Sequence, residues 1–76
     1  MGQTEVFDWL ARQRLASDNF FTSKEIFLGV EKNAYRCVRQ SVLKLVEFGF
    51  LETNNSFPRQ VRAKKGVAIM FLKKNY

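Results

Sequence analysis

A single glycine, Gly49, separates an amphipathic helical segment from an aromatic segment with the character of a β-strand. Glycine adopts the left-handed backbone conformation without steric cost, and that conformation commonly ends α-helices. Phe50 and Leu51 follow at once, and aromatic residues are enriched in strands. We therefore expect a helix that stops at Gly49 and a β-hairpin that begins directly after it.

The segment before Gly49 has the two faces of an amphipathic helix, which we expect over about residues 33–48, with Asn33 as its N-cap. One face is apolar at helical spacing, with Ser41 beside it: Ala34, Val38, Val42, Leu45 and Phe48. The other face is mainly polar and basic: Tyr35, Arg36, Arg39, Gln40 and Leu43. Leu43 interrupts the basic face, so it either extends the core or marks a protein contact.

A first helix is expected near the N-terminus, where Thr4 can act as its cap. Its apolar residues recur at helical spacing up to about residue 15: Val6, Phe7, Leu10, Ala11 and Leu15. Trp9 lies off the centre of this stripe. It either flanks the core or faces a partner.

A second helix is predicted by a capping-box pattern, in which Thr22 is followed three residues later by Glu25. Each of these side chains can accept a hydrogen bond from a free backbone N–H at the helix start. The helix should run over about residues 23–28 and end at Gly29. Its buried residues should be Ile26 and either Phe27 or Leu28.

Two apolar segments after Gly49, residues 50–53 and 67–72, are predicted to form the strands of a hairpin. Residues 54–66 between them mix turn-forming residues with four basic side chains, Arg59, Arg62, Lys64 and Lys65. A short additional strand over residues 60–63, followed by a turn at 64–66, is the alternative to one long loop. The four basic side chains should be mobile and support no core.

Cysteine and histidine usage excludes several classes of site. The chain has one cysteine, Cys37, and no histidine. An internal disulfide, a structural zinc site and a Cys–His or Ser–His catalytic pair are therefore excluded, and we expect no enzyme activity, metal or cofactor. Cys37 should be a small buried side chain of the basic helix. A reducing, intracellular and cytoplasmic location is expected.

The length of 76 residues suits one domain over residues 1–76 with a single core. The longest strongly apolar run, residues 67–72, is far shorter than the roughly 20 residues that a membrane-spanning helix requires. No membrane segment is therefore expected. Because no helix is predicted outside the core, we expect a monomer or a weak homodimer.

Positive charge is concentrated in the second half of the chain. Residues 1–31 contain three basic and five acidic residues, whereas residues 32–76 contain ten basic and two acidic residues. The net charge is +6. Such an uneven distribution is typical of a surface that faces phosphate groups.

The order helix, helix, turn, helix, strand, loop, strand resembles the winged helix-turn-helix family. The resemblance covers about residues 4–74 and is best at residues 45–52, where an acidic residue precedes Gly49 and the aromatic strand. Residues 20–22 would form the short strand that joins the hairpin. The fold class implied is α+β, with three helices followed by a C-terminal β-hairpin wing.

The resemblance implies a small transcriptional regulator that binds double-stranded DNA. The helix over residues 33–48 would enter the major groove, and the wing over residues 54–66 would contact the backbone or the minor groove. Arginine can pair with guanine and glutamine with adenine, while lysine neutralises phosphate. The DNA-binding residues implied are Asn33, Tyr35, Arg36, Arg39, Gln40, Lys44, Arg59, Arg62, Lys64 and Lys65.

Each of these side chains also has a plainer role open to it. Arg36 could pair with Glu31 or Glu47, Arg39 could keep an exposed face soluble, and Tyr35 could pack against the wing.

Two other functions remain open. A protein-interaction module within a larger complex would use Trp9, Leu43 and the apolar last strand, whereas an RNA or single-strand binder would stack bases on Tyr35 and Phe57. A continuous basic surface would favour nucleic acid, and a basic surface broken by an apolar patch would favour a protein partner.

Overall fold

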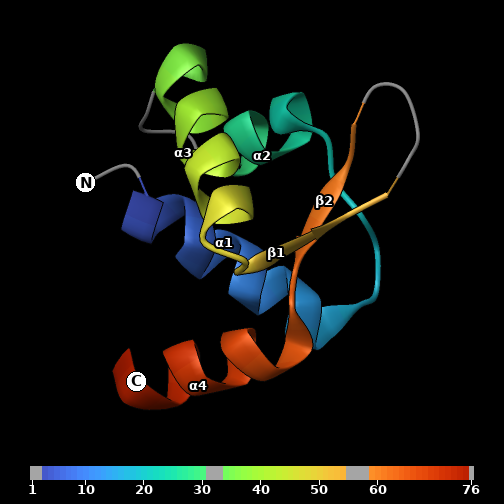
Figure 1. Cartoon of the computed structure of the whole chain (residues 1–76), viewed down its shortest axis with the longest axis vertical. Coiled ribbons are helices and arrows are strands. Elements are labelled where there is room, and N and C mark those ends of the chain that lie inside the picture. The colour runs from blue at the N-terminus through green and yellow to red at the C-terminus, as the bar shows by residue number, and fades with distance from the viewer. Residues whose placement is uncertain (1–2, 31–33, 55–58, 76) are drawn as a thin grey trace.

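The computed structural model describes residues 3–30, 34–54 and 59–75 of the chain (Figure 1). These residues form an α+β structure of helices and an antiparallel sheet, as expected. The elements are α1 (Gln3–Ala16), α2 (Ser23–Val30), α3 (Tyr35–Glu47), β1 (Leu51–Thr53), β2 (Val61–Ala63) and α4 (Lys65–Asn75). Asn33, Glu31 and Phe57 lie outside the described residues, so the expected cap, one possible ion pair and one possible stacking residue have no structural account.

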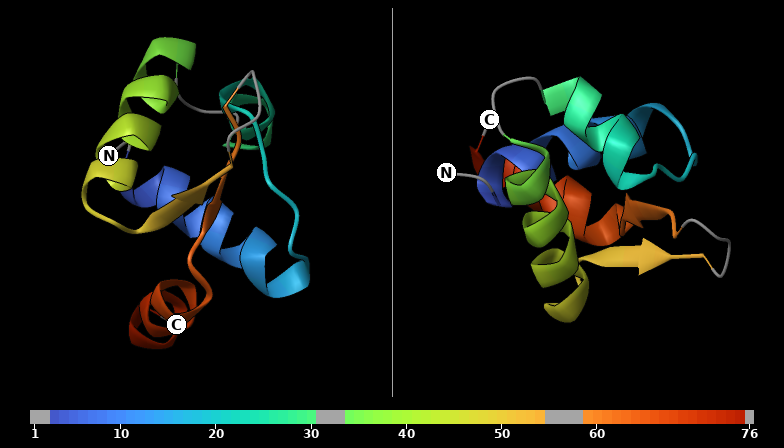
Figure 2. Two further views of the ribbon diagram at one scale, coloured as in Figure 1. Left: turned by 45° about the vertical axis from the view of Figure 1, so that its right-hand side comes forward. Right: turned by 90° about the horizontal axis from the view of Figure 1, so that it is seen from above.

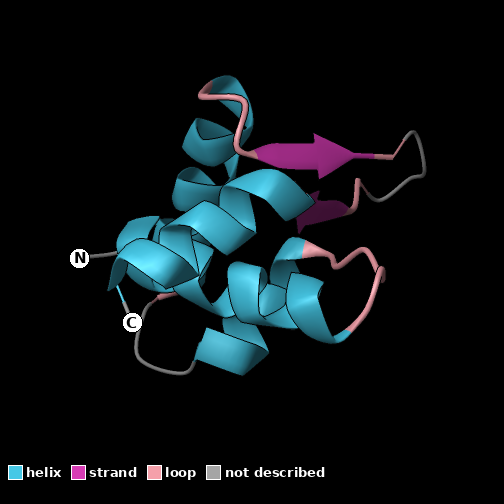
Figure 3. Cartoon of the chain, turned by 90° about the horizontal axis from the view of Figure 1, so that it is seen from below, coloured by secondary structure: helices cyan, strands magenta, loops and turns pink. Residues whose placement is uncertain are grey.

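Helix α1 occupies the centre of the fold and contacts α2, α3, α4 and β2. In Figure 1, α2 and α3 lie above α1 and α4 lies below it. Figure 3 shows the two strands on one side of the helices. One apolar cluster fills the space between these elements: Val6, Phe7, Leu10, Ala11, Ile26, Val38, Val42, Leu45, Leu51, Val61, Ala63 and Ala68.

The hairpin pairs β1 with β2 in antiparallel register, with Leu51 opposite Ala63 and Thr53 opposite Val61. The predicted short strand at residues 20–22 is a single bridge, in which Phe21 and Val61 exchange two backbone hydrogen bonds of 2.8 Å. Val61 and Ala63 point into the core while Arg62 lies on the other side of the sheet, as strand alternation requires. Residues 61–63 are thus the second strand of the hairpin, the alternative left open by the sequence.

The predicted strand at residues 67–72 is wrong, because these residues belong to α4. The sequence predicted three helices followed by a C-terminal hairpin. The described residues instead form four helices, and the hairpin lies between the third and the fourth. The burial pattern gives the reason: Ala68 is buried, Phe71 is half-buried, and Ile69 and Met70 are exposed. This spacing is helical, but a six-residue apolar run does not by itself distinguish a helix from a strand.

Gly49 ends the preceding helix as predicted, with a φ of 80°. The Phe50 N–H donates to the Leu45 carbonyl at 3.0 Å, and the Gly49 N–H donates to the Val46 carbonyl at 3.0 Å. These two bonds form a Schellman motif, which satisfies carbonyls that the helix end leaves free. Figure 2 shows β1 leaving the C-terminal end of α3 through this turn.

The capping box at the start of α2 is also confirmed. The Thr22 N–H donates to Glu25 Oε1 at 2.8 Å, and the Glu25 N–H donates to Thr22 Oγ1 at 3.2 Å. Gly29, however, does not end α2, which continues to Val30. Ile26 is buried and Phe27 half-buried, as expected for two of the three apolar candidates.

Other local expectations are corrected by the fold. Thr4 lies inside α1, which begins at Gln3, and Leu15 is exposed because the core contacts end at the previous turn. Cys37 is exposed, since the buried stripe of α3 consists of its neighbours Val38, Ser41, Val42 and Leu45. Ala34 and Phe48 flank α3 as its N-cap and C-cap and are exposed, so the buried stripe is shorter than predicted.

Candidate nucleic-acid interface

The exposed face of α3 carries the polar residues predicted to read DNA. Val38, Ser41, Val42 and Leu45 are buried, and the following side chains of the helix are exposed: Tyr35, Arg36, Arg39, Gln40, Leu43, Lys44 and the acidic Glu47. Because residues advance by about 100° around a helix, Arg36, Gln40, Leu43 and Glu47 lie almost directly opposite the buried stripe, whereas Tyr35 lies beside it. Arg39 and Lys44 flank this line on either side.

Neighbouring helices position this face rigidly. α3 packs against α1 and α2, and the Tyr35 ring meets the Phe27 ring of α2 edge-on at a centroid distance of 5.6 Å. Tyr35 therefore packs against α2 and not against the wing. Leu43 is 47% exposed, so it does not extend the core.

The cations of α3 differ from three of the four arginines on the other described segments, Arg59 being the exception. Arg12 pairs with Asp8 at 3.1 Å, Arg14 pairs with Asp18, and Arg62 pairs with Glu52 at 2.8 Å. By contrast, no ion pair joins Arg36, Arg39 or Lys44 to an acidic group within residues 3–30, 34–54 and 59–75. The predicted alternative pair of Arg36 with Glu47 is absent from that same part of the chain. The charge of α3 is therefore available to a ligand.

Arg62 does not have the position expected of a mobile wing cation. Its Nε donates to Glu52 Oε2 at 2.8 Å, and its Nη1 donates to the Asp18 carbonyl oxygen at 2.7 Å. The guanidinium also lies over the Phe20 ring, 4.4 Å from its centroid. These contacts join β2 to the α1–α2 connection, so Arg62 has a structural role and the expectation of a mobile side chain that contributes through charge alone is wrong for this residue.

The other predicted wing cations lie on three different elements. Arg59 is exposed in the hairpin loop, Lys64 joins β2 to α4, and Lys65 begins α4. The Lys64 N–H donates to the Phe50 carbonyl at 3.1 Å, which extends the strand pairing by one step. These cations therefore do not form one loop surface.

The base of the hairpin loop is closed by two residues that sequence reasoning missed. Asn54 Nδ2 donates to Gln60 Oε1 at 2.8 Å, and the Asn54 N–H donates to the Gln60 carbonyl at 3.1 Å. Lys73 and Lys74 were also missed, because the segment before them was interpreted as a strand. A helical interpretation would have placed both lysines in the last turn of α4, where cations are favoured.

Comparisons with known proteins do not identify a relative. No protein-family model matches the chain, and no significant match is found among curated proteins or solved structures. Within the described residues, no cluster of three or more Cys, Asp or Glu side chains could hold a metal ion. No helix in that part of the chain has the length and apolar character needed to cross a membrane.

Proposed function

We propose that this protein binds double-stranded DNA through the exposed face of α3, in the manner of a small winged-helix transcriptional regulator. The observation that carries this proposal is the set of unpaired cations on α3: Arg36, Arg39 and Lys44 pair with no acidic group among the described residues, whereas Arg12, Arg14 and Arg62 on other elements each pair with one. A helix with unpaired cations along its outer face matches the negative charge of the major groove.

The order of elements supports the same proposal. A helix, a bridge, two packed helices and a two-stranded hairpin follow one another in the order of a winged helix, and α4 is an addition at the end. In such an arrangement Arg36 and Gln40 would contact guanine and adenine edges. Leu43 would contact a thymine methyl group, which gives an exposed leucine a place on a basic face.

Arg59, Lys64 and Lys65 would contact phosphates on either side of the groove. Arg62 is paired with Glu52, so it would contribute to DNA binding more by holding the hairpin in position than by its own charge. The protein-interaction alternative loses one of its expected contacts, because Trp9 is half-buried against Phe21, with ring centroids 5.1 Å apart. Three exposed apolar side chains, Phe48, Phe50 and Met70, line a groove near the end of α3.

Fluorescence anisotropy of a labelled random duplex at a series of salt concentrations tests the proposal. If four to six phosphates are neutralised, log K should fall with log salt with a slope of about −4 to −5. A salt-independent affinity, or no binding at low salt, would contradict it. Arg12→Ala is a matched control for charge, because Arg12 lies on α1 and pairs with Asp8.

A further inference from the structure

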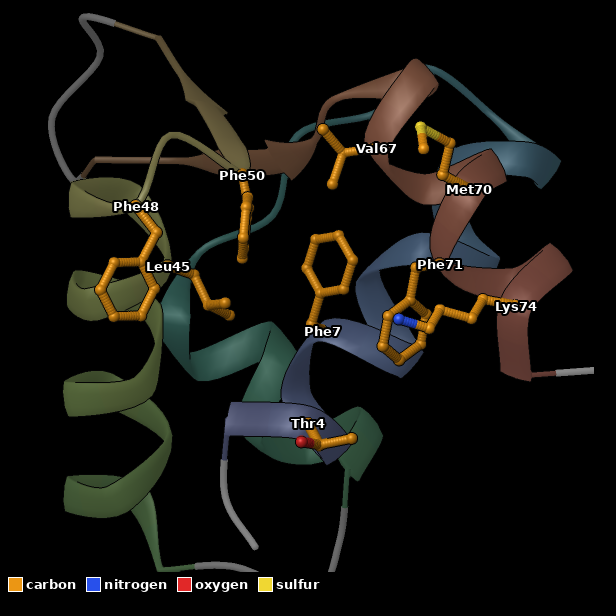
Figure 4. Close-up of a pocket in the computed structure, with 9 residues that line it drawn as sticks. All are labelled: Thr4, Phe7, Leu45, Phe48, Phe50, Val67, Met70, Phe71 and Lys74. Carbon is orange, nitrogen blue, oxygen red and sulfur yellow. The ribbon is translucent and has the colours of Figure 1, made fainter.

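An apolar groove of about 540 Å³ lies between the start of α1, the end of α3 and α4 (Figure 4). This volume falls within the range of about 300–1,000 Å³ that is usual for small-molecule sites. The residues that line it are mostly apolar: Thr4, Phe7, Leu45, Phe48, Phe50, Val67, Met70, Phe71 and Lys74.

The aromatic wall of the groove is preformed. Phe7 is buried and contacts Phe50 at a centroid distance of 5.8 Å and Phe71 edge-on at 5.0 Å. Phe48 continues the row, 5.9 Å from Phe50. Because Phe7 belongs to the core, the position of this row is set by the fold itself.

The rim of the groove exposes large apolar side chains to water. Phe48 is 58% exposed and Met70 is 74% exposed, although each lies next to other apolar groups. Contiguous apolar surface of this kind marks a binding site more often than a single exposed residue does. An occupant with an apolar body would therefore bury the most surface here.

The positive charge at the groove favours an occupant with a negative charge. Lys74 is the only charged side chain among the described residues that line it. In Figure 4 the Lys74 side chain lies beside Phe71, with its nitrogen directed towards the groove. No acidic residue occurs in residues 59–75, so this part of the wall has no carboxylate to neutralise Lys74 or attract a cation.

We infer that this groove binds a small anionic amphiphile, with an aromatic or medium-length acyl body against the phenylalanines and a carboxylate or sulfonate at Lys74. A second copy of the chain that met this groove through its own α4 would add the positive charges of its Lys73 and Lys74 to that of Lys74, because α4 contains no acidic residue. The inference does not depend on DNA binding, because no side chain of the exposed α3 face lines the groove.

The test uses two fluorescent probes of similar shape, the anionic 1-anilinonaphthalene-8-sulfonate and the neutral N-phenyl-1-naphthylamine. The sulfonate should bind saturably at one site per chain and be displaced by dodecanoate. Lys74→Gln should weaken sulfonate binding about three- to tenfold and leave the neutral probe almost unchanged. Lys73→Gln is the matched control, because it removes the same charge from the neighbouring residue, which does not line the groove.

Met70→Glu provides a second variant that keeps the fold, because Met70 is largely exposed. It should abolish sulfonate binding by adding a negative charge and removing apolar contact. Circular dichroism melts of all variants separate a lost site from a lost fold. Equal effects of Lys73→Gln and Lys74→Gln, non-saturable binding, or a stable dimer by sedimentation that masks the groove would each overturn the inference.

Discussion

The indole ring of Trp9 occupies the space in which any residue other than glycine at position 29 would place its Cβ. A Cβ built on Gly29 would lie 2.4 Å from both Cε2 and Cζ2 of Trp9. The ring also packs against Phe21, which it meets edge-on, and this contact restricts its movement. Gly29 is therefore required for the contact between α1 and α2, although it lies inside a helix.

Gly29→Ala should lower stability by about 1–3 kcal/mol, because the overlap with Trp9 outweighs the gain in helix propensity. For a domain of this size the melting temperature should fall by roughly 4–8 °C for each kcal/mol. Gly66→Ala in α4 is the matched control, because no atom lies within 4 Å of the new Cβ. That variant should melt at the same or a slightly higher temperature, and equal losses in both would show that the Trp9 contact is not the cause.

Gly49→Val should destabilise the fold by about 1–2 kcal/mol or more, since a β-branched residue adopts a φ of 80° poorly. The space around Gly49 is open, so the cost is conformational and not steric. Gly49→Asn should cost less, because asparagine tolerates the left-handed region. Thermal or urea melts that rank the two variants in the opposite order would contradict the left-handed cap as the reason.

Arg62→Ala should destabilise the protein by about 1–2 kcal/mol, because it removes the pair with Glu52 and the hydrogen bond to the Asp18 carbonyl. Lys64→Ala removes the same charge two residues away and serves as the control. Its side chain is exposed, so its melting temperature should stay close to that of the unchanged protein. A similar loss in both variants would mean that net charge, and not the Arg62 contacts, sets the effect.

The double variant Arg36→Ala/Arg39→Ala should weaken binding to duplex DNA and lower the salt slope by about two units if both arginines contact phosphate. If either contacts a base, sequence preference should weaken as well, at a cost of about 1–3 kcal/mol for that residue. Arg12→Ala, measured in the same anisotropy assay, should leave affinity almost unchanged. Equal losses in the double variant and the control would remove α3 as the binding face.

Lys64→Ala/Lys65→Ala should weaken binding to all duplexes by a similar factor and lower the salt slope by up to two units, with base preference retained. Both side chains are exposed, and neither takes part in a side-chain ion pair with another described residue. Anisotropy titrations against two duplexes of different sequence measure this. A loss confined to one duplex would assign these lysines to base reading.

Local patterns in the sequence determined the parts of this structure that depend on a few neighbouring residues. The capping box of Thr22 and Glu25, the left-handed stop at Gly49 and the two faces of α3 were all predicted. Each depends on backbone geometry within one or two helical turns, which residue type and spacing specify directly. The positions of the candidate DNA-reading side chains on the exposed side of α3 were predictable for the same reason.

Tertiary contacts decided the rest. Residues 67–72 form a helix, since Ala68 and Phe71 pack on α1 and the edge next to β1 is already taken by β2. Arg62 is held by Asp18, which lies 44 residues away in the chain, and Gly29 is needed only because Trp9 lies beside it. Partners this distant in sequence leave no local periodicity, so only the folded chain shows which side chains are free for a ligand and which hold the structure together.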